Sequence, residues 1–268
     1  MAANLTSPTH TKPNMEPEYE VRLRLNPAEV LGPDQRLAEN VLLAFKMPPT
    51  DTKLNVQFLD MSYKEIYTAG WSPRIRKTEN EDDFELTYKK RYTITGGNID
   101  AALTAANEDG FNAGDAKYEA QVEWGYRNQT LSISHKKTGS KSENDRMGLP
   151  GTSKSREMLI GEAPDKFDNW KHREWGTSAL LVSRIFGPVL ARRFTGKWKD
   201  MKLYLEVWPL LNLEGTGIEY IVEASFKTKS RTTASLELGN LADFLQTNDT
   251  AHYGAILIWE VIGPKDGS

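Results

Sequence analysis

Charged and apolar side chains alternate from residue 18 to residue 25, where Glu18, Glu20, Arg22 and Arg24 are each followed by an apolar residue. Neighbouring side chains of a β-strand point to opposite faces, so this segment predicts a strand with one charged and one apolar face. Such a strand usually has the core on one side and water on the other. The rest of the chain repeats the pattern and changes that interpretation.

Similar alternation returns over residues 84–89, 117–124, 201–207 and 218–227, and Arg74 and Arg76 flank Ile75 in a shorter piece. The polar positions are mostly carboxylates, lysines and arginines. A solvent-facing sheet would be expected to mix in more Ser, Thr, Asn and Gln. Recurring acids and bases on one face therefore favour a closed or strongly curved sheet, whose charged faces meet in a lumen and whose apolar faces are covered by helices.

The 268 residues are enough for one barrel with a large core. We expect a disordered leader over residues 1–16 and one domain over residues 17–268. The segment 138–155, rich in Gly, Ser, Lys and Asn, predicts a mobile loop. The remaining patterns predict helices near residues 34–45, 98–107, 156–170 and 236–246, and a buried apolar strand over residues 255–261.

Composition limits the classes of function. The formal net charge is −3, which gives no sign of a nucleic-acid-binding surface. The chain has no cysteine, so a disulfide framework and a thiolate metal site are excluded, and any metal would have oxygen ligands. We find neither a membrane-spanning apolar run nor a secretory signal, and we expect a cytoplasmic protein without a membrane partner.

The candidate chemistry lies on the predicted charged faces. Magnesium and manganese need hard oxygen ligands, and the candidates are Glu18, Glu20, Glu85, Glu119, Glu123, Glu206, Glu219 and Glu223. Guanidinium and ammonium groups suit phosphate, and the candidates are Arg22, Arg24, Arg74, Arg76, Lys89, Arg192 and Arg193. The alternative is that these opposite charges only form a salt-bridge network.

The first strand also resembles a known family. The run from Glu18 to Arg22 is similar to the N-terminal Glu-x-Glu-x-Lys signature of the CYTH superfamily, the triphosphate tunnel metalloenzymes, with arginine in place of the usual lysine. Further matches follow in the same order along residues 18–227, namely Phe58-Leu59-Asp60, Gly70-Trp71-Ser72, Arg74-x-Arg76, Glu85 to Lys89, Arg192-Arg193 and Glu223.

The resemblance implies an eight-stranded antiparallel tunnel that binds a triphosphate or a related polyanion. It implies Mg²⁺ or Mn²⁺ held by glutamates from the set Glu18, Glu20, Glu85, Glu206 and Glu223, and phosphates held by the basic residues named above. Glu20, Arg76 and Lys89 become the catalytic candidates. One departure concerns the metal, because the late strand has Ser225 where the family generally has a second glutamate after Glu223.

Two functional hypotheses follow. In the first, the protein is a divalent-metal-dependent hydrolase of a phosphoanhydride, with phosphate charge neutralised by arginine and lysine. In the second, it is a diverged tunnel protein that binds a phosphorylated or diphosphorylated small molecule and catalyses elimination or cyclisation, or only binds it. Trp208 lies on the same predicted face as Glu206 and suits the organic part of such a molecule.

Overall fold

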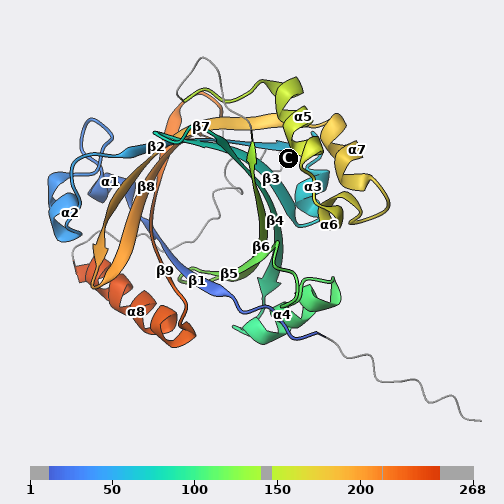
Figure 1. The fold of residues 1–268 in the computed structure, drawn as a ribbon. Helices are drawn as coiled ribbons and strands as arrows, with labels where there is room; N and C mark the ends of the chain where they lie inside the picture. Colours follow the sequence, from blue (N-terminus) through green and yellow to red (C-terminus); the bar gives the residue numbers. More distant parts are fainter. Residues whose placement is uncertain (1–11, 140–146, 213, 248–268) are drawn as a thin grey trace, which may run out of the picture.

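The chain folds into a closed barrel of nine strands with helices on its outside (Figure 1). The computed structural model describes residues 12–139, 147–212 and 214–247. The strands are β1 Glu18–Leu25, β2 Thr52–Asp60, β3 Trp71–Thr78, β4 Phe84–Ile94, β5 Glu119–Trp124, β6 Gln129–Gly139, β7 Arg184–Trp198, β8 Met201–Leu211 and β9 Ile218–Thr228. The helices are α1 Pro27–Val30, α2 Glu39–Ala44, α3 Glu65–Thr68, α4 Ile99–Glu108, α5 Thr152–Gly161, α6 Asp165–Asp168, α7 Trp175–Leu181 and α8 Arg231–Thr247.

The strand order around the barrel is β1-β5-β6-β4-β3-β2-β7-β8-β9, and β9 pairs with β1 to close the ring. Every pairing is antiparallel except that of β1 with β5, which is parallel. The prediction of a closed, mainly antiparallel barrel is confirmed. In the part of the chain that the structure describes, the barrel has nine strands where eight were expected, and the short β5 lies between β1 and β6.

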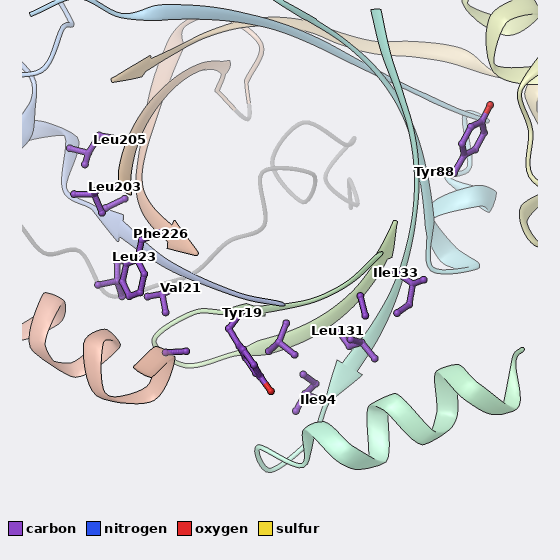
Figure 2. Close-up of a cluster of buried hydrophobic side chains, with 14 of the residues drawn as sticks. Tyr19, Val21, Leu23, Tyr88, Ile94, Leu131, Ile133, Leu203, Leu205 and Phe226 are labelled. Carbon is purple, nitrogen blue, oxygen red and sulfur yellow. The ribbon is translucent and has the colours of Figure 1, made fainter. Parts of the chain in front are cut away.

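The large hydrophobic core lies between the barrel and its helices. Figure 2 shows Val21, Leu23 and Phe226 on the side of the strands that faces α8, and Leu131 and Ile94 on the side that faces α4. All of these side chains are buried. The apolar faces of the alternating strands therefore point outward, as predicted, and their charged faces point into the barrel.

A carboxylate fixes the turn between β2 and β3. The buried Asp60 ends β2 and accepts hydrogen bonds from the backbone N–H groups of Met61, Ile66 and Tyr67, at 2.7, 3.0 and 2.9 Å. These donors include the unpaired N–H groups in the first turn of α3. Asp60 therefore couples the end of one barrel strand to the helix that leads into the next.

Aromatic side chains attach α6 and the residues after it to the barrel. The ring of Trp71, at the start of β3, lies edge-on to the rings of Phe167 in α6 and Trp170. The ring centroids are 5.3 and 5.6 Å apart, respectively. Tyr88 of β4 lies 5.3 Å from the same Phe167 ring. Such tilted pairs contribute roughly 0.5–1.5 kcal/mol each beyond the burial of their area. They therefore stabilise the packing of α6 and the residues after it against this face of the barrel.

Several element predictions can be placed. The final helix predicted over residues 236–246 is confirmed inside α8, whereas the helix predicted over 34–45 is shorter, because residues 34–36 form a turn in which Asp34 accepts from the Arg36 N–H. In the predicted leader, Asn14 forms a β-bridge with Asn112. The predicted loop over 138–155 includes the end of β6 and the start of α5, and its residues 140–146 lie outside the described part.

The strand predicted over residues 255–261 lies outside the described residues as well. Among the residues described, none of the helices has the length and apolar character needed to cross a membrane.

Candidate functional site

The inside of the barrel holds a cavity of about 1160 Å³. Its lining includes nine lysines and arginines and seven glutamates. The cations come mainly from β3, β4 and β6, and the carboxylates Glu206 and Glu223 come from β8 and β9 on the opposite side of the ring (Figure 1). A wall rich in cations therefore faces a wall on which two carboxylates lie together with the cations Arg193 and Lys227.

The basic wall is built on the β3–β4 hairpin. Arg74 and Arg76 lie two residues apart on β3, and each donates one hydrogen bond to Glu85 of β4, at 2.9 and 2.8 Å. Arg74 also donates to Thr87 at 3.1 Å. The two guanidinium groups thus share one carboxylate, which leaves positive charge on this wall uncompensated by Glu85.

Burial makes this uncompensated charge unfavourable in the absence of a ligand. Desolvation, together with the neighbouring Arg76 and Arg91, lowers the pKa of Arg74 to about 10. The Nε atoms of Arg74 and Arg76 are both buried and find no hydrogen-bond acceptor among the described residues. An anion with several oxygens would supply both the missing acceptors and the missing negative charge.

Lys89 extends the basic wall further along β4. Its ammonium group contacts the buried Glu123 of β5 at 2.7 Å, and Ser132 donates to the same carboxylate oxygen at 2.8 Å. Desolvation, partly opposed by Glu123, and the repulsion of neighbouring arginines lower the pKa of Lys89 to about 8. Next to it, Arg91 donates to Ser72 at 2.8 Å and lines the same cavity.

Arg22 lies among the carboxylates of the tunnel. It binds Glu20 through Nε at 2.9 Å and is within ion-pair distance of Glu123 and Glu223, at 3.9 and 3.8 Å. The burial of Glu20 would by itself raise the pKa of its carboxyl group. Arg22 and the neighbouring cations nevertheless hold that pKa below its ordinary value. In the ladder between β1 and β9, Arg22 stands opposite Ser225, the residue found where the CYTH pattern has a second glutamate.

Glu206 and Glu223 form the acidic part of the opposite wall. They are direct partners in the β8–β9 ladder, so both side chains point into the tunnel from adjacent strands. Glu206 is held by Arg193 at 2.6 Å and by the indole N–H of Trp208 at 3.0 Å. Burial, and then repulsion from Glu206, Glu20 and Glu123, raises the pKa of Glu223 to about 7 despite Arg22.

Among the predicted metal ligands, Glu206 and Glu223 are the two that enter the tunnel from paired positions of adjacent strands. The described residues contain no group of three or more metal-ligating side chains close enough to form a site made by the protein alone. Mg²⁺, however, commonly uses one or two carboxylates and completes its shell with water and substrate phosphates. Burial, and then the neighbouring carboxylates, raise the pKa of Glu223, and a cation beside it would favour the charged form.

A third part of the tunnel wall is apolar. Leu54, Val56 and Phe58 of β2 and Trp208 of β8 line the same cavity as the charged residues. They belong to a compact hydrophobic cluster, separate from the outer core, whose remaining buried members are Phe186, Val189, Ala191, Leu210 and Ile221. We call this set of nine residues the apolar wall. It follows β2, β7, β8 and β9, between the basic wall and the two glutamates.

Most predicted site residues line the tunnel, namely Glu18, Glu20, Arg22, Arg74, Arg76, Glu85, Lys89, Glu119, Arg193, Glu206 and Glu223. The other four candidates, Arg24, Glu123, Arg192 and Glu219, are not among the residues that line the cavity. Arg192 lies on the outer face of β7, since it neighbours the inward-facing Arg193 and side chains alternate along a strand, so the prediction that both arginines bind substrate is corrected. Arg24 is half-buried on β1 near Glu219 and Glu223 and is also absent from the lining.

Sequence reasoning missed other lining residues. Arg91 continues the alternation of Glu85, Thr87 and Lys89 by one step, and that signal was available in the sequence. The cations Lys136, Lys227 and Lys229 were also missed. In the apolar wall, the prediction that Trp208 lies on the inner face with Glu206 is confirmed. Leu54, Val56 and Phe58 gave no such signal, because a strand with an apolar inner face has the same alternating sequence as one with an apolar outer face.

Neither a scan against known protein families nor a search of curated proteins finds a match for this chain. Solved structures do resemble it. A candidate adenylate cyclase from Bacillus halodurans aligns with a TM-score of 0.51 and 11% identity, over 91% of this chain and 96% of that one. This chain has the CYTH-like tunnel fold.

Two further structures align with this CYTH-like tunnel at lower scores. One is a candidate adenylyl cyclase from Hippeastrum, described as having a dominant triphosphatase activity, with a TM-score of 0.48 and 13% identity over 90% of this chain and 93% of that one. The other is a protein from Pyrococcus horikoshii, with a TM-score of 0.45 and 14% identity over 91% and 98%. Because the sequence identities are this low, the similarity of these structures to the chain concerns the fold and nothing more.

Proposed function

We propose that the CYTH-like tunnel binds the phosphates of a phosphorylated small molecule and hydrolyses a phosphoanhydride bond with the help of a divalent cation. The observation that supports this most directly is the basic wall, where Arg74 and Arg76 share one carboxylate and keep buried N–H donors without acceptors among the described residues. A purely structural network of ion pairs would be expected to satisfy such donors internally.

The proposal gives each wall a role. Arg74, Arg76 and Lys89 bind phosphate oxygens and stabilise the negative charge that spreads over them in the transition state. Glu223, whose pKa is raised to about 7 by burial and by neighbouring carboxylates, would be held in its charged form by a bound cation. Glu20 acts as a positioning residue, because it holds Arg22 in place at 2.9 Å.

Mg²⁺ or Mn²⁺ would be held by Glu206 and Glu223 together with the substrate phosphates. A cation there would neutralise charge on the phosphate oxygens and polarise the bond that breaks. Glu18 and Glu85 are less suited to the role, since Glu85 is taken up by two arginines and Glu18 lies 3.6 Å from Lys227 with its side chain 41% exposed.

The test is phosphate release from inorganic tripolyphosphate and from nucleoside triphosphates, with Mg²⁺, with Mn²⁺ and with a chelator. Adjacent arginines on β7 provide a matched pair of variants. We expect Arg193→Ala, which loses a side chain inside the tunnel, to lower kcat/KM at least tenfold. Arg192→Ala, on the outer face of the same strand, should stay within about twofold, a difference of under 0.5 kcal/mol.

Two results would count against hydrolysis. If phosphate release is absent while tripolyphosphate binds, the tunnel is a binding module. If pyrophosphate is released from an organic diphosphate, the reaction is an elimination or a cyclisation, and the apolar wall favours this second candidate because it offers a dry surface for a carbon skeleton.

A further inference from the structure

The apolar wall begins directly beside the phosphate-binding arginines. In the β2–β3 ladder, Phe58 is the partner of Arg74 and Val56 is the partner of Arg76. All four side chains line the cavity, so the two pairs set hydrocarbon next to guanidinium on one continuous surface. A molecule that places phosphate on the arginines therefore has its next atoms against Val56 and Phe58.

The wall then continues away from the phosphates. In the β2–β7 ladder, Val56 is paired with Val189 and Leu54 with Ala191. In the β8–β9 ladder, Trp208 is paired with Ile221. Leu54, Val56, Phe58 and Trp208 line the cavity, whereas Val189, Ala191 and Ile221 belong to the same buried cluster without lining it. The indole N–H of Trp208 at this end donates a hydrogen bond to Glu206.

Size and polarity together restrict the ligand. A cavity of about 1160 Å³ is at the upper end for small-molecule sites, which range over roughly 300–1,000 Å³. A bare triphosphate would use only the charged part and leave the apolar wall without a partner. Sugars and polar amines would have to give up hydrogen bonds to water against that wall.

We infer that the substrate is a diphosphate ester of a hydrophobic alcohol, with its phosphates on Arg74 and Arg76 and its hydrocarbon chain along the apolar wall. This inference rests on the proposed function, since it places the phosphates at the same arginines. It adds the chemical class of the rest of the molecule. Burying the chain contributes about fourfold in affinity for each methylene that is fully removed from water.

The experiment is calorimetric titration of the full chain, in chelator, with inorganic diphosphate and with butyl, octyl and dodecyl diphosphate below their aggregation limits. We expect affinity to rise at least tenfold from inorganic to octyl diphosphate, with a heat capacity change that becomes more negative as the chain lengthens. Val56→Thr keeps the side-chain shape and adds a hydroxyl, so it should reduce the octyl-to-inorganic affinity ratio severalfold.

Leu190→Thr is the matched control, because Leu190 lies on β7 and is 45% exposed. The Leu190→Thr variant should have the same ratio of octyl to inorganic diphosphate affinity as the unaltered protein. If inorganic diphosphate and tripolyphosphate bind but affinity does not depend on chain length, or if a nucleoside triphosphate binds more tightly than every alkyl diphosphate, the inference is wrong and the proposed function stands. If no phosphate compound binds, the proposed function fails with it.

Discussion

Single residues set the charge balance inside the tunnel. Arg22 replaces the lysine of the CYTH pattern and remains charged at any ordinary pH, so it serves as a permanent counter-ion for Glu20, Glu123 and Glu223. Its 3.8 Å distance from Glu223 is too long for a hydrogen bond. Glu223 is consequently the least stabilised carboxylate of this group, and its pKa of about 7 lies far above that of Glu20.

Glu223 gives a pH prediction for the metal-free protein. Its pKa is raised in the folded state, from an ordinary 4.5 to about 7, so the folded protein binds more protons than the unfolded chain between these values. Stability is therefore highest below pH 4.5 as far as this group is concerned, and it falls as pH rises to 7. In chelator, the free energy of unfolding of the unaltered protein should fall by roughly 3 kcal/mol between pH 4.5 and pH 7 because of this group. The Glu223→Gln variant should not show this fall, and denaturant unfolding at each pH measures the difference.

The same unfolding measurement, made with Mg²⁺ in place of chelator, tests whether Glu223 is a metal ligand. If Glu223 is a ligand, Mg²⁺ at pH 7.5 should stabilise the unaltered protein in the presence of a phosphate ligand and should have little effect on Glu223→Gln. Equal stabilisation of both proteins would place the cation elsewhere.

A second residue-scale prediction concerns Lys89 and Glu123. Their contact of 2.7 Å is shielded from water, with the Glu123 side chain only 2% exposed. A double-mutant cycle with Lys89→Met and Glu123→Gln should give a coupling energy of about 2–3 kcal/mol. The pair Lys136 and Glu119 is similarly short at 2.5 Å but exposed, and it should give under about 1 kcal/mol. Similar couplings for the two pairs would contradict the role assigned to burial.

At the scale of elements, β2 decides how the tunnel is divided. Its polar residues Asn55 and Gln57 face outward, where they donate to the backbone oxygens of Met147 and Pro150, at 2.8 and 3.0 Å. Gln57 also donates to Ser155 of α5 at 2.8 Å. Because this outer cover offers hydrogen-bond acceptors, the polar face of β2 can be turned away from the lumen, and its apolar face turns inward.

The end of β2 gives a stability prediction. Asp60→Ala removes the acceptor of three backbone N–H groups in a fully buried place, and it should lower the free energy of unfolding by roughly 3 kcal/mol. Urea unfolding followed by circular dichroism measures this. Asp83→Ala in the exposed turn before β4 is the control and should change stability by under about 0.5 kcal/mol. A small effect of Asp60→Ala would mean that water replaces the carboxylate.

At the scale of the whole molecule, the closed barrel brings charges from distant parts of the chain into one low-dielectric space. The basic wall comes from residues 74–91, and Glu206 and Glu223 come from more than a hundred residues later. Burying these charges costs desolvation energy, and like charges on each side repel one another, so the packed outer core has to offset both costs. A polyanion that neutralises the basic wall should therefore stabilise the fold as a whole.

The corresponding prediction is thermal. Tripolyphosphate at a hundred times its Kd, in chelator, contributes about 2.7 kcal/mol, which for a domain of this size raises Tm by roughly 5–10 °C. The shift should shrink as salt is added, since screening weakens the attraction. The double variant Arg74→Met/Arg76→Met should lose most of it, whereas sulfate at equal ionic strength should not reproduce it. An undiminished shift in that variant would move the phosphate site away from the basic wall.

The sequence by itself determined the barrel and much of its charged lining. Period-two alternation in β1, β4, β8 and β9 fixes which residues share a face, and the density of charge on those faces indicates a lumen rather than a solvent-facing sheet. The same rule, carried one step further, would have found Arg91. It could also have separated Arg193 from Arg192, since adjacent residues of a strand cannot both face inward.

Only the tertiary structure decided how the lumen is divided. Which face of β2 points inward depends on what covers its outside, and that cover is supplied by α5 and the residues before it, about ninety positions away in sequence. The pKa of Glu223 is likewise raised by burial in the closed barrel and then by three carboxylates on three other strands. Both properties come from contacts between distant segments, and a local pattern of polarity carries no information about such contacts.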